Sequence, residues 1–197
     1  MKQFVLILFS IALANSCEKK LKPIPDIYYE DLLNEIIPHK KIEYWEYRNY
    51  DYLESTTEII IEKGDNYNSL NIPYLELKSS FREGCHPTMC FDYIVAIEDG
   101  KCVYIDEISE VSEFIGEINN IAEALILKYI VAPELYSISE DGEQVGMYYI
   151  NKKEVNFILL KDESVCPKII GQYLLTINRT THEITSSRIK TYYQEKI

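Results

Sequence analysis

The chain is poor in basic side chains, and its few glycines are scattered. It has 20 lysines and arginines against 32 aspartates and glutamates, which gives a net charge of −12. This balance argues against nucleic acid as a partner, because phosphate backbones are bound by clustered basic side chains. The seven glycines lie singly, so no glycine-rich phosphate loop is present. We therefore expect neither nucleic acid nor a bound cofactor.

Histidine is also scarce, with only His39, His86 and His182 in the chain. A structural zinc site takes four ligands, which usually come in two paired units. Here a single pair, Cys85 and Cys90, encloses His86, and four residues separate the cysteines instead of the two of a thioredoxin-like motif. We expect a disulfide loop at this pair, no metal site and no catalytic residues. Metal binding and thiol catalysis are the alternatives.

No hydrophobic run is long enough to cross a bilayer, which takes roughly 20 helical residues. The apolar run Phe4–Ala14 follows the positive Lys2 and leads to the small residue Ser16. A positive start, a short apolar middle and a small-residue exit are typical of a secretory signal peptide. We predict that residues 1–16 are such a signal peptide.

The exit sequence Ala14-Asn15-Ser16-Cys17 resembles the lipobox of bacterial lipoproteins. In that family the cysteine thiol receives a diacylglycerol and becomes the acylated first residue of the mature protein. The resemblance implies lipid attachment at Cys17, a tether over residues 17–25 and a location in the cell envelope, at the outer membrane if the host is Gram-negative. The richness in isoleucine, lysine, asparagine and tyrosine resembles low-GC, Bacteroidetes-like members, and we recognise no functional family. Ordinary cleavage after Ser16 is the alternative.

The five cysteines are an odd number, which leaves one thiol over in an exported chain. Lipidation of Cys17 would use that thiol and leave four, enough for two disulfides in an oxidising compartment. We predict the pairs Cys85–Cys90 and Cys102–Cys166. Sequence alone does not choose among the three pairings that four cysteines allow.

Strands dominate the rest of the chain. β-Branched and aromatic residues are enriched in short runs separated by turn signals. The dipeptide Asp99-Gly100 predicts a two-residue hairpin turn that pairs Glu98 with Lys101 and Ile97 with Cys102. The predicted strands cover residues 42–53, 56–61, 91–97, 102–105, 145–150, 155–160, 169–177 and 183–193.

Two helical segments complete the expected fold. Residues 108–129 carry apolar side chains three and four apart, with acidic residues such as Glu123 expected outside. Gly116 interrupts them, so we expect one long helix or two helices that meet there. Asp26 is a candidate N-cap for a helix that ends before Pro38. The sequence thus predicts a single α+β domain over residues 26–197, with a mainly antiparallel sheet built from hairpins, covered by one long or kinked helix, and with an N-terminal helix.

The aromatic residues near position 47 are the candidate binding residues. Aromatic side chains with polar tips are frequent at interfaces, and they also pack well within a sheet. We favour a membrane-anchored, non-catalytic binding protein of unknown ligand, whose acidic surface attracts a basic protein partner; an inhibitor or immunity protein is one subtype. An envelope hydrolase or thiol-redox factor is the alternative. The candidate contact residues are Tyr44, Trp45, Tyr47 and Tyr50.

Overall fold

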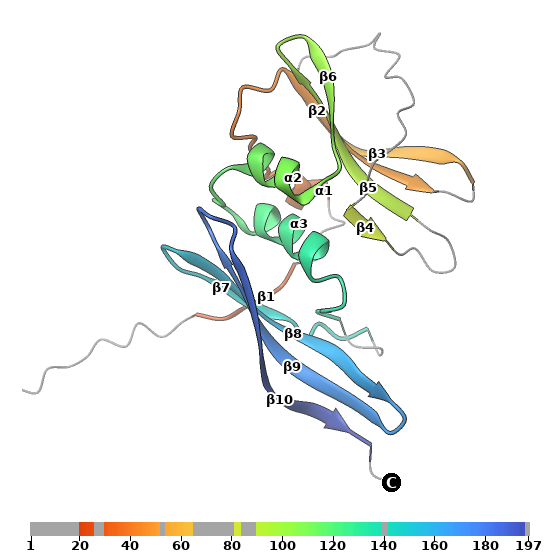
Figure 1. Ribbon diagram of the computed structural model, residues 1–197, viewed down its shortest axis with the longest axis vertical. Coiled ribbons are helices and arrows are strands. Elements are labelled where there is room, and N and C mark those ends of the chain that lie inside the picture. Colours follow the sequence, from red (N-terminus) through yellow and green to blue (C-terminus); the bar gives the residue numbers. More distant parts are fainter. Residues whose placement is uncertain are drawn as a thin grey trace, which may run out of the picture.

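Two antiparallel sheets enclose a layer of short helices (Figure 1). The computed structural model describes residues 20–25, 30–51, 54–64, 81–83, 90–138 and 142–195. Side chains from both sheets and from the helices form one hydrophobic core. The prediction of a single sheet covered by one long or kinked helix, with an N-terminal helix, was therefore wrong.

The N-terminal sheet has the strand order β3-β2-β5-β4, with β6 pairing beside β4 on the same side of β5. The predicted turn at Asp99-Gly100 is confirmed, since both residues have positive φ, 49° and 69°. The register is also as expected, with Glu98 opposite Lys101. The strands are β2 (Tyr44–Asp51), β3 (Thr56–Gly64), β4 (Phe81–Glu83), β5 (Cys90–Glu98) and β6 (Lys101–Ile105).

The C-terminal sheet has the order β1-β7-β8-β9-β10 and is antiparallel throughout. Strand β8 runs five residues beyond the predicted end at Leu160 and turns at Cys166 and Pro167 into β9. The charged stretch after Leu160 lies outside the predicted strands, yet it pairs with β9 where the sheet extends past the helices (Figure 1). The strands are β1 (Lys22–Pro23), β7 (Met147–Ile150), β8 (Glu154–Val165), β9 (Lys168–Asn178) and β10 (Ile184–Gln194).

Gly116 separates two helices, α2 (Ile108–Ile115) and α3 (Ile121–Val131), which were one of the two alternatives predicted for this segment. Both begin with a capping box, in which Glu110 and Glu123 accept from the backbone of the preceding turn. The helices lie between the sheets (Figure 1). On one side, the ring of Phe114 meets that of Trp45 from β2 edge-on, with 5.5 Å between centroids.

Helix α3 is buried around its whole circumference from Ile121 to Lys128. A helix with a sheet on each side needs apolar residues on both sides, which is why its sequence is apolar almost throughout. Glu123 was expected outside and is instead fully buried, since its carboxylate caps the helix and also accepts from the backbone N–H of Ile37 at 3.3 Å.

The expected N-terminal helix is reduced to one turn, α1 (Glu30–Leu33). Its candidate N-cap, Asp26, lies outside the described residues. Leu33 and Ile36 are buried as the apolar pattern indicates, but Ile37 is 67% exposed because the helix has already ended.

Candidate functional site

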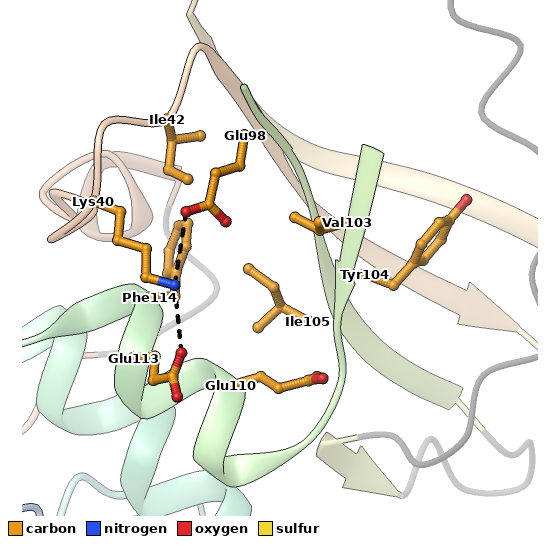
Figure 2. A pocket seen from close by; sticks show the side chains of 9 residues that line it. All are labelled: Lys40, Ile42, Glu98, Val103, Tyr104, Ile105, Glu110, Glu113 and Phe114. Atoms are coloured by element: carbon orange, nitrogen blue, oxygen red, sulfur yellow. Dashed lines mark hydrogen bonds and ion pairs between the residues drawn. The ribbon is translucent and has the colours of Figure 1, made fainter. Parts of the chain in front are cut away.

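A small cavity opens between α2, the β5–β6 hairpin and the segment before β2 (Figure 2). Its volume is about 160 Å³. We call it the acidic cavity. The hairpin turn brings the end of β5 beside β6, and α2 begins three residues after β6, so three elements meet at one edge. The lining residues are Lys40, Ile42, Glu98, Val103, Tyr104, Ile105, Glu110, Glu113 and Phe114.

The acidic cavity combines apolar walls with carboxylates at its rim. Figure 2 shows Ile42, Ile105 and Phe114 around the space, whereas the ring of Tyr104 lies on the other side of β6. The side chains of Glu98 and Glu113 are 35% and 71% exposed, so both carboxylates can meet a solute.

Lys40 already places an ammonium group between these carboxylates. Its Nζ lies 3.6 Å from Glu98 Oε1 and 3.4 Å from Glu113 Oε2. The hydrogen bond to Glu113 and the negative charge of Glu98 raise the pKa of Lys40. All three side chains are in contact with water, which screens their attraction and leaves the lysine exchangeable.

Glu110 has a different role in the same cavity. Its Oε2 accepts from the backbone N–H groups of Asp106, at 3.2 Å, and Glu107, at 3.3 Å. These bonds satisfy donors at the start of α2 that have no partner within the helix. Glu110 therefore holds the helix start in place, and Glu98 and Glu113 are the exchangeable carboxylates.

This arrangement suits the end of a lysine or arginine side chain. The aliphatic part of such a side chain packs on apolar walls while its charged end reaches carboxylates in water. The described residues contain no group of three histidine, cysteine, aspartate or glutamate side chains placed to hold a metal ion.

A second polar cluster lies on the face of the N-terminal sheet that points away from the helices. The hydroxyl of Tyr44 contacts the carboxylates of Glu46 and Glu62, the latter at 2.9 Å, and the guanidinium of Arg48 donates to Glu46. Burial and the two carboxylates raise the pKa of Tyr44. Because Glu46 is buried and paired on both sides, this cluster holds β2 and β3 in register.

The candidate contact aromatics are mostly built into the sheet. Tyr44 is buried in the second polar cluster, and Trp45, 3% exposed, packs on the helix layer. Tyr47 donates to Asp92 at 2.9 Å, and burial raises its pKa well above the usual value. Tyr50 is half-buried. Tyr44, Trp45 and Tyr47 therefore present no surface to a partner in this structure.

The described cysteines do not form the predicted second disulfide. Cys102 lies on β6 and Cys166 in the β8–β9 turn of the other sheet, and both are free. The helix layer between the sheets separates them, so the predicted pair Cys102–Cys166 was wrong. Cys90 begins β5, while Cys17 and Cys85 lie outside the described residues, so the pair Cys85–Cys90 and the lipid attachment site stay predictions.

Sequence reasoning did not select the residues of the acidic cavity. It paired Glu98 with Lys101 across the hairpin, as the structure has it. It expected the acidic side chains of residues 108–129 outside, which holds for Glu113 but not for Glu123. Lys40 follows α1, and the sequence around it shows no pattern that marks it as a binding residue. Only the tertiary structure brings these three side chains together.

No family model, curated protein or solved structure matches this chain. Among the described residues, no helix is both long enough and apolar enough to span a membrane.

Proposed function

We propose that this chain is an exported, membrane-anchored, non-catalytic binding protein that recognises basic groups on a protein partner through the acidic cavity. The observation that carries the proposal is the position of Lys40, whose ammonium lies between two exposed carboxylates above apolar walls. A lysine or arginine of a partner would replace it with the same chemistry.

The distribution of charge supports a basic partner. Residues 1–160 contain 28 acidic and 14 basic side chains, whereas residues 161–197 contain four acidic and six basic ones. The acidity therefore belongs to the part of the chain that forms the cavity. Such a field accelerates encounters with a basic protein and weakens as salt is added.

The membrane anchor is proposed on the lipobox-like sequence before Cys17. Four residues separate Cys17 from Lys22, the first residue of β1, so the chain between the two spans at most about 18 Å. A lipid on Cys17 would thus keep the C-terminal sheet close to the bilayer surface, because β1 pairs with β7 of that sheet.

Titration calorimetry with a short peptide of lysine and alanine tests the cavity. We expect the double variant Glu98→Gln/Glu113→Gln to bind about tenfold more weakly, since two charge-assisted contacts are lost. Lys40→Met keeps the aliphatic chain but removes the competing ammonium, so it should bind more tightly than the wild type.

Glu58→Gln/Glu183→Gln is the matched control, because it also removes two negative charges and both glutamates are exposed and lie outside the cavity. It should bind like the wild type. If it weakens binding as much as the cavity variants do, the attraction is a general effect of net charge and the proposed site is wrong.

A further inference from the structure

Strand β10 forms a free edge of the C-terminal sheet within the described part of the chain. Its residues from Thr185 to Gln194 are all exposed, and Figure 1 shows the strand along the outer margin of the sheet. An edge of this kind presents backbone N–H and C=O groups that have no partner in the sheet, and an extended chain can pair with them.

The register identifies which backbone groups point outward. The N–H of Asn178 donates to the C=O of Glu183 at 2.9 Å, so these two residues form a hydrogen-bonded pair. Hydrogen-bonded and non-hydrogen-bonded pairs alternate along an antiparallel ladder. Ile184, Ser186 and Arg188 therefore direct their N–H and C=O groups away from β9.

This edge is regular over five residues. The pairing of β10 with β9 runs unbroken from Ile184 to Arg188, and the first irregularity follows between Arg188 and Lys190. Five residues of strand extend about 17 Å, enough for a short added strand. Exposed apolar side chains flank the regular stretch on the C-terminal side, namely Ile189, Tyr192 and Tyr193.

The charges of β10 favour an acidic occupant. Its only charged side chains are Arg188 and Lys190, both basic. Arg188 donates to Glu163 of β8 and is itself 43% exposed. Antiparallel pairing of two copies about Ile189 would place Arg188 of each copy opposite Lys190 of the other, and like charges directly opposite are destabilising. A second copy in that register is therefore a poor partner, whereas an acidic segment is attracted by both side chains.

We propose that the edge of β10 between Ile184 and Arg188 binds an extended acidic segment of another protein as an additional antiparallel strand. Outward backbone groups supply the directional bonds, and the two basic side chains select acidic residues in the segment. This site is separate from the acidic cavity and does not depend on the function proposed for it.

The test is an NMR titration of the protein with a capped ten-residue peptide of alternating threonine and glutamate. We expect the amide signals of Ile184, Ser186 and Arg188 to shift and their hydrogen exchange to slow, with saturation at millimolar peptide. The same peptide N-methylated at alternate residues cannot form the ladder and should bind at least about tenfold more weakly. Equal binding of both peptides, or no shift at these amides, would overturn the proposal.

Two protein variants extend the test. Ser186→Pro removes one outward N–H and leaves the bonds to β9 in place, so peptide binding should weaken about tenfold or more. Lys190→Glu should reverse the preference from the glutamate peptide to its lysine counterpart. If Ser186→Pro unfolds the protein, the N-methylated peptide decides the question on the wild type. A dimer of the free protein that Ser186→Pro abolishes would show that a second copy occupies the edge, and would contradict the proposal.

Discussion

Gly116 occupies a backbone conformation that is almost restricted to glycine, with φ 65° and ψ −133°. A Cβ at this position would lie 2.4 Å from the Cγ of His39. In the sequence the same glycine only weakened the prediction of one long helix. In the structure it ends α2 and lets the segment around His39 approach closely, with the His39 N–H donating to the C=O of Phe114 at 2.7 Å.

Gly116→Ala should therefore lower the free energy of unfolding by about 2–4 kcal/mol, through backbone strain and overpacking together. Gly100→Ala is the matched control, because φ is 69° and no atom lies within 4 Å of the added Cβ. It should lower the free energy of unfolding by only about 1–2 kcal/mol, which is the cost of the left-handed backbone conformation for alanine. Urea unfolding of both variants measures the difference, and equal losses would mean that the contact with His39 is relaxed easily.

Glu163 gives the C-terminal sheet a dependence on pH. Its carboxylate accepts from Arg188 at 2.9 Å and from Tyr173 at 2.8 Å, and these bonds lower its pKa from 4.5 to about 2. A carboxyl whose pKa is lower in the folded state stabilises that state above the pKa of the unfolded chain. This contribution is lost as the pH falls from about 4.5 to about 2.

NMR titration of the Glu163 side-chain carboxyl should show a midpoint of about 2. Arg188→Gln should raise this midpoint more than Tyr173→Phe does, because the hydrogen bonds from Arg188 are the largest cause of the lowered pKa. A wild-type midpoint at the ordinary value for glutamate would show that the Arg188 contact does not persist in solution.

At the scale of elements, the two capping boxes of the helix layer differ in what they connect. In α3 the carboxylate of Glu123 accepts from the N–H groups of Asn119, at 2.6 Å, and Ile37, so a single buried side chain ties α3 to the end of the α1 segment. In α2 the corresponding Glu110 satisfies only its own helix start. The same capping box thus connects two distant segments in α3, whereas in α2 it stabilises only the start of its own helix.

Glu123→Ala should consequently destabilise the protein by about 2–4 kcal/mol, because three part-buried backbone N–H groups lose their acceptor and a fully buried side chain is removed. Glu110→Ala, the matched change in the more exposed cap, should cost about 1 kcal/mol. Thermal and urea unfolding of the two variants measure which substitution lowers the free energy of unfolding more. Equal effects would indicate that water replaces the carboxylate of Glu123.

At the scale of the whole molecule, the proposed anchor and the charge distribution act together. A single diacylated cysteine would hold the folded body within a few residues of the bilayer, while its excess of acidic groups repels anionic headgroups. The body would then face away from the surface and toward soluble basic partners.

Cys17→Ser should transfer the protein from the membrane fraction to the soluble fraction of its native host. Mass spectrometry of the wild type should find a mature chain that starts at Cys17 and carries the added lipid. Ser16→Asp, which disturbs the cleavage site but keeps the thiol, serves as the processing control and should accumulate the uncleaved form. An unmodified Cys17 in the wild type would contradict the anchor.

Local patterns determined most of the strands and their turns, although not β1, β4 or the end of β8. Positive φ at Asp99 and Gly100 follows from the residue types, and the hairpin fixes its own register, so Glu98 meets Lys101 without help from the rest of the fold. The change of period after β6 likewise marks the helices, and Gly116 marks their boundary. These features depend on neighbours in sequence, which is why the sequence by itself determined them.

Contacts between distant segments decided the rest. Whether the apolar residues of α3 face one sheet or two depends on where β7 to β9 pack, and no local pattern specifies that. The burial of Glu123, the separation of Cys102 from Cys166 and the placing of Lys40 between Glu98 and Glu113 follow from the same packing. Only the tertiary structure decided them, because each depends on the free energy of burying two sheets against one helix layer and not on the preference of any single segment.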